Sequence, residues 1–158
     1  MELDELFGLP AHPLVVHAVV VLLPLAALVT FGCAAVPRAR RAYGPLALGL
    51  ALAATVSVTL AQSSGEELVR KVDKTQLVEE HEERGERVLP WAIAVTIVAA
   101  TVTAAPLLTR RDRFAGGRVT AIVVVLALVA GTGAIWTVIE VGHSGAKATW
   151  NEVGASSG

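Results

Sequence analysis

Four long apolar blocks, separated by polar segments, dominate the chain. None of them contains Asp, Glu, Lys or Arg, and they cover Pro13–Val36, Gly44–Gly65, Val88–Thr109 and Val119–Ile139. A helix needs about 20 apolar residues to cross a hydrocarbon core about 30 Å thick, and each block has that length. We therefore predict one all-α integral membrane domain over residues 1–158, a four-helix transmembrane bundle with spans at about 13–36, 44–65, 88–109 and 119–141.

The connection between the second and third blocks has a different pattern. Apolar residues recur in it at near-helical spacing among charged ones, at Leu68, Val69, Val72, Leu77 and Val78. This pattern is typical of an amphipathic helix that lies along a membrane surface. We expect one such helix over residues 66–84.

The charges indicate how the spans are oriented. Apolar residues make up 54% of the chain and charged ones 17%, against about 25% charged residues in soluble domains. The arginines gather after the first block and after the third, at Arg38, Arg40, Arg41, Arg110, Arg111, Arg113 and Arg118. Short arginine-rich loops stay in the cytoplasm, so both termini and the predicted amphipathic helix are expected outside.

All four histidines flank apolar blocks, and an up-and-down bundle brings them to the same side of the membrane: His12, His17, His81 and His143. His12 and His17 differ by five residues, which is a rotation of about 140° on a helix. They are therefore expected to have separate roles, with His17, deeper in the helix, facing the bundle interior. In the alternative interpretation, His12 is the N-cap residue of the first helix and binds no cofactor or metal.

Two further features concern carboxylates near these rings. Glu140 precedes His143 by three residues and shares its helix face, so it is a candidate metal ligand or a group that orients the ring, unless it pairs with Lys147. His81 lies among four glutamates, which are expected to favour its protonated form or to mark a solvated face. Each half also runs from a histidine through two spans to a Ser-Gly pair, Ser64-Gly65 or Ser144-Gly145, which raises the hypothesis of an internal duplication.

Two short motifs resemble a known family. The start, residues 8–17 (GLPAHPLVVH), and the exit from the fourth span, residues 142–146 (GHSGA), resemble the bacterial "domain of unknown function 2231" membrane proteins, with Ala146 where a second glycine is common. The resemblance covers nearly the whole chain, and it implies that the family's histidines correspond to His12, His17, His81 and His143. It implies a multi-pass protein of the bacterial cytoplasmic membrane. Because relatives occur fused to Rieske iron–sulfur or cytochrome c domains, it also implies an electron-transfer setting, by analogy.

Three functions are consistent with these residues. The leading hypothesis is a haem b or other redox-metal site at the outer face, with His17 and His143 as axial ligands. The second is a copper or zinc site that uses His12, His17 and His143 together with His81 or Glu140. The third is a non-catalytic accessory subunit of a membrane complex, docked through its small-residue faces and its outer amphipathic helix.

Other functions have less support. No catalytic motif is found, so an enzyme is less favoured and no catalytic residue is assigned. The expected partners are the lipid bilayer and a redox protein or respiratory complex, not nucleic acid. Whether the protein forms a homo-oligomer is left open.

Overall fold

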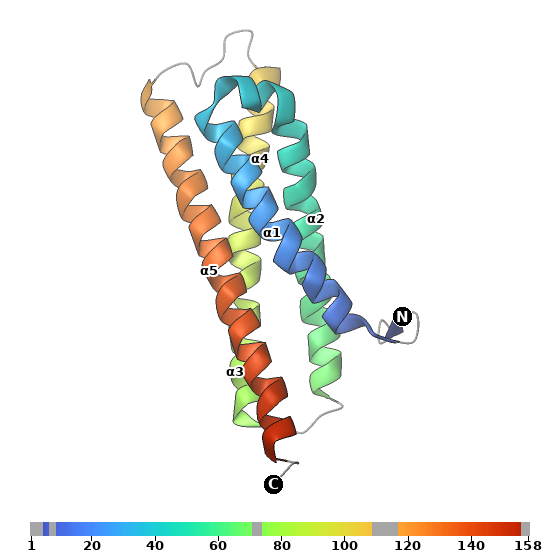
Figure 1. The fold of residues 1–158 in the computed structure, drawn as a ribbon. Helices are drawn as coiled ribbons and strands as arrows, with labels where there is room; N and C mark the ends of the chain where they lie inside the picture. Colours follow the sequence, from blue (N-terminus) through green and yellow to red (C-terminus); the bar gives the residue numbers. More distant parts are fainter. Residues whose placement is uncertain (1–4, 7–8, 71–73, 109–116, 156–158) are drawn as a thin grey trace.

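The computed structural model describes residues 5–6, 9–70, 74–108 and 117–155, with side chains at 12–70, 74–105, 117–147 and 150. These residues form five helices, α1 (Ala11–Ala35), α2 (Pro37–Val69), α3 (Gln76–Glu86), α4 (Val88–Leu108) and α5 (Gly117–Ala155). Ahead of them, two-residue strands β1 (Glu5–Leu6) and β2 (Leu9–Pro10) pair antiparallel. The four long helices run up and down as a bundle (Figure 1). This confirms the predicted all-α bundle.

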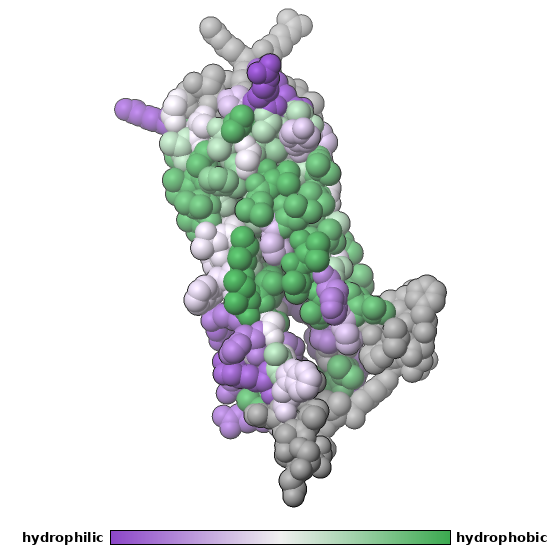
Figure 2. All heavy atoms as spheres, in the orientation of Figure 1, coloured by the Kyte–Doolittle hydropathy of each residue, from purple (hydrophilic) through white to green (hydrophobic). Residues whose placement is uncertain are grey.

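The surface of the bundle is suited to lipid. Within the described residues, four helical stretches are long and apolar enough to cross a membrane. Large apolar side chains point outward from all four long helices, among them Leu28, Leu52, Ile97 and Ile122. Figure 2 shows the resulting hydrophobic belt, with hydrophilic residues gathered toward both ends. A soluble monomer rarely exposes an apolar surface of this extent, whereas lipid tails cover it at no cost.

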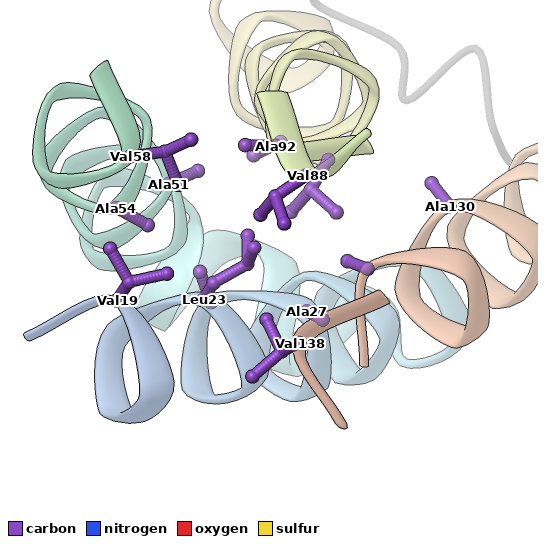
Figure 3. Close-up of a cluster of buried hydrophobic side chains, with 14 residues drawn as sticks. Val19, Leu23, Ala27, Ala51, Ala54, Val58, Val88, Ala92, Ala130 and Val138 are labelled. Carbon is purple, nitrogen blue, oxygen red and sulfur yellow. The ribbon is translucent and has the colours of Figure 1, made fainter. Parts of the chain in front are cut away.

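The interior, in contrast, is built from small residues. Fully buried positions include Ala26, Ala34, Ala47, Ala51, Ala54, Ala92, Ala99 and Ala134, with Leu23 and a few valines filling the space between them (Figure 3). Lipid gives helices no hydrophobic reason to associate, so close backbone approach and interhelical hydrogen bonds must hold them together. One such bond joins the Thr55 and Thr96 hydroxyls at 2.9 Å, between α2 and α4.

The first turn between spans is much shorter than predicted. We expected the second span at 44–65, after an arginine-rich loop, but α2 already begins at Pro37 and only Val36 separates it from α1. Val36 is extended and Pro37 occupies the first helical turn, where its missing N–H is not needed. The buried Arg40 donates from Nε to the Cys33 carbonyl (3.2 Å) and from Nη2 to the Ala34 carbonyl (2.9 Å). It thereby caps the C-terminal end of α1.

The predicted amphipathic helix over 66–84 is also wrong in its bounds. Residues 66–69 continue α2, and the separate helix α3 begins only at Gln76. Thr75 is its N-cap, with its hydroxyl accepting from the Val78 N–H at 3.4 Å. Apolar periodicity fits both pieces, so it gave no sign of where one helix stops and the next starts. The polar helix between the second and third spans is nevertheless present, as predicted.

The helix order gives the bundle two different ends. Helix α1 packs on α2 and α5, and α4 packs on the same two helices, so α1 and α4 are diagonal partners that run in the same direction. At one end lie the start of α1, the end of α2, helix α3 and the end of α5; we call it the histidine end. The other, with the α1–α2 turn and the start of α5, is the arginine end.

Candidate functional site: paired histidines at one end of the bundle

His12 lies in the first turn of α1 and contacts the last turns of α2. Its Nδ1 is 3.0 Å from the Ala61 carbonyl oxygen and 3.3 Å from the Ser64 hydroxyl. The Ser64 hydroxyl in turn donates to the same Ala61 carbonyl at 3.1 Å. A carbonyl can only accept, so Nδ1 must carry the ring proton. The neutral ring then has its lone pair on Nε2, the nitrogen that bonds neither group.

His81 forms the same arrangement between α3 and α5. Its Nδ1 is 3.0 Å from the Ser144 hydroxyl, and that hydroxyl donates to the Val141 carbonyl at 3.0 Å. Because the hydroxyl proton is used in this bond, the Ser144 oxygen accepts from Nδ1–H of His81. Nε2 is again the nitrogen with the free lone pair. Both rings are thus presented in the tautomer that binds a metal through Nε2.

A glycine next to each serine lets the ring approach. A Cβ added at Gly65 would lie 3.1 Å from His12 Cε1, and one added at Gly145 would lie 3.0 Å from His81 Cε1. Carbonyl, serine and glycine are spaced identically in the two helices, at positions i, i+3 and i+4 from Ala61 and from Val141. We call the two groupings, of histidine, carbonyl, serine and glycine, half-sites. The hypothesis of an internal duplication had identified the Ser-Gly pairs, but not their role as histidine partners.

The two half-sites are close enough for a charge on His12 to act on His81, and the surroundings of His81 favour a neutral ring. Helix α3 is polar and precedes the apolar helix α4, so His81 lies outside the lipid-spanning segment. Burial lowers the pKa of His81 from its usual value, and the charge that His12 carries when protonated and that of Arg84 lower it further, against a raising effect of the Val141 carbonyl. We expected the neighbouring glutamates to favour protonation; this is wrong, because burial is the largest effect on the pKa of His81 and lowers it. A neutral imidazole is the form that binds a metal.

The remaining sequence candidates lie elsewhere at the histidine end. His17 is exposed, and its Nδ1 bonds the Pro13 carbonyl of its own helix at 2.6 Å. The expectation that His17 faces the interior is therefore wrong: helix α1 begins at Ala11, and its rotation turns His12 inward instead. His143 is exposed on α5, and Glu140 is half-buried one turn before Ser144. Nothing in the described contacts links His17 with His143, so that axial pair stays a prediction.

A multi-ligand metal site is not formed by the described residues. Within these ranges, no group of three or more His, Cys, Asp or Glu side chains is placed to hold a metal ion. The set proposed for copper or zinc, with His12, His17, His81, Glu140 and His143, is therefore not gathered at one point by this part of the chain. What the fold does provide is two imidazoles at the same end of the bundle, each held by a neighbouring helix.

Fold and site together define an integral membrane four-helix bundle with paired histidine half-sites at one end. The chain belongs to the DUF2231 family, described as predicted membrane proteins, whose family model matches residues 8–157. This confirms the resemblance seen in the sequence. No curated protein and no solved structure matches the chain.

Proposed function

We propose that this protein binds haem b at the histidine end of the bundle, with His12 and His81 as axial ligands, and that it serves in membrane electron transfer. One observation carries the proposal: two imidazoles, one on α1 and one on α3, each with Nδ1–H fixed by a partner and Nε2 left with its lone pair. Haem-binding bundles take their axial ligands from side chains on facing helices. The pair His12 and His81 replaces His17 and His143 in this proposal because only the former are held by the bundle.

The number of protein ligands favours haem over a bare metal ion. Copper and zinc sites need three or four protein ligands, and the described residues gather no group of three or more His, Cys, Asp or Glu side chains. A porphyrin provides four nitrogens of its own, so two axial imidazoles complete the coordination of its iron. When bound, the haem would supply reversible one-electron chemistry. The chain's own part is to hold both rings, fix their tautomers and surround them with helix.

The proposed orientation places this site on the outer side of the bacterial cytoplasmic membrane. Arg38 and Arg41 are exposed at the arginine end, and the excess of arginine there favours the cytoplasm. The glutamate-rich helix α3 then lies on the outer face, next to the site. An electron-transfer protein or respiratory complex on that side is the partner class that this arrangement suits.

The test is optical. Protein purified without a polyhistidine tag is examined as isolated, after reduction with dithionite and during titration with haemin. We expect a Soret band and a sharp α band on reduction, with one haem per chain. His12→Ala and His81→Ala should each abolish this low-spin spectrum, whereas the matched changes His17→Ala and His143→Ala should leave it intact.

Three results would contradict the proposal. A wild-type protein that neither contains haem nor binds added haemin would exclude it. Loss of the spectrum only in the His17 and His143 variants would show that these two residues are the axial ligands, as expected from the sequence. Stoichiometric copper or zinc by elemental analysis, without porphyrin, would favour the second hypothesis.

A further inference from the structure

The two half-sites repeat not only the histidine but also the bond that fixes it. Each serine stands three residues after the carbonyl that takes its proton, and its oxygen receives Nδ1–H from a ring on another helix. Both serines are buried, Ser64 at 7% and Ser144 at 3% exposed. Neither is needed for helix formation, and Ser57 and Ser63 show the ordinary alternative, since each bonds only its own helix.

The direction of these bonds sets what the serines can do. Because each hydroxyl gives its proton to a carbonyl, the histidine does not act on it as a base, and a nucleophilic serine is not formed. The partial negative charge of the serine oxygen instead stabilises the proton on Nδ1 of the histidine. This makes Nε2 a stronger electron-pair donor to a metal. Partners of this kind fix ring orientation and raise ligand basicity at metal sites.

We propose that Ser64 and Ser144 are positioning residues, which hold His12 and His81 in the Nδ1–H tautomer for a haem iron bound through Nε2. This rests on the proposed haem function. The two serines contribute unequally. His12 has the Ala61 carbonyl at 3.0 Å as well as Ser64 at 3.3 Å, so it keeps a strong acceptor when Ser64 is removed. For His81, the shortest bond among the described residues is that to Ser144 at 3.0 Å, and the Val141 carbonyl acts on the ring in addition.

The first experiment needs no haem. The full chain, with ¹⁵N-labelled histidine, is studied in detergent above pH 8, where ring ¹⁵N shifts distinguish the two neutral tautomers. Wild type should show His12 and His81 as Nδ1–H tautomers. Ser144→Ala should move His81 toward a mixture, Ser64→Ala should change His12 less, and Ser63→Ala should change neither. An unchanged His81 signal in Ser144→Ala would overturn the proposal.

The second experiment reads the same variants with haem bound. Ser144→Ala is expected to weaken haemin binding about 10-fold and to shift the midpoint potential upward, because a weaker donor favours ferric iron less. Ser144→Thr, which keeps the hydroxyl, should restore both. Equal values for Ser144→Ala and wild type would refute the positioning role. If wild type binds no haemin while the tautomer still changes, the haem function fails and the serine assignment stands, so the two failures are distinguishable.

Discussion

The contact between Gly133 and Trp91 offers a sharp test of the packing of α4 against α5. A Cβ added at Gly133 would lie 2.4 Å from two atoms of the Trp91 ring, Cε3 and Cζ3. Carbon atoms pack best at about 3.5–4.0 Å, so the ring or the helix must move by about 1 Å or more. The ring belongs to a half-buried side chain at the edge of the main hydrophobic cluster, and overpacking of this kind costs about 1–3 kcal/mol.

Gly133→Ala is therefore expected to lower stability, even though alanine favours a helix by about 1 kcal/mol over glycine. The assay is thermal unfolding of the purified protein in detergent, followed by circular dichroism and tryptophan fluorescence. Gly49→Ala is the matched control: it lies mid-helix on α2, and an added Cβ there meets nothing within 4 Å. It should be neutral or stabilising.

A double-mutant cycle then isolates the contact. In a Trp91→Ala background the ring is gone, so Gly133→Ala should no longer destabilise. The reasoning fails if Gly133→Ala unfolds at the same temperature as Gly49→Ala, or if its cost persists without the Trp91 ring.

Two further predictions concern the arginine end and the orientation. Arg40→Met removes a buried guanidinium and both of its bonds to the end of α1, so we expect a loss of about 2–4 kcal/mol in the same unfolding assay, with the exposed Arg41→Met near neutral; equal effects would contradict the capping role. In a Cys33→Ala background, a single cysteine at Glu83 should react with a membrane-impermeant maleimide added to intact cells or spheroplasts, and one at Arg41 only after permeabilisation. The reverse pattern would invert the proposed topology.

The sequence was sufficient for the large-scale architecture. Length and the absence of charge in four blocks determine four spans, since lipid excludes shorter or charged segments. An even number of crossings between consecutive histidine-bearing segments then puts His12, His17, His81 and His143 at one end of the bundle. The repeated Ser-Gly pairs could also be recognised in the sequence, but their contacts with the histidines could not.

Only the tertiary structure decided which histidine rings are hydrogen-bonded to a neighbouring helix of the bundle. In a soluble helix the polar side identifies the exposed face. A helix in lipid is apolar on both its inner and its outer face, so its hydrophobic pattern does not show which side faces the bundle. His12 rather than His17 faces the bundle because His12 lies on the same side of α1 as Val19 and Leu23, which pack into the core. The partners Ser64 and Ser144 lie 52 and 63 residues from their rings. Their contact depends on how far the helices slide along one another, and the packing of small residues in the core fixes that register.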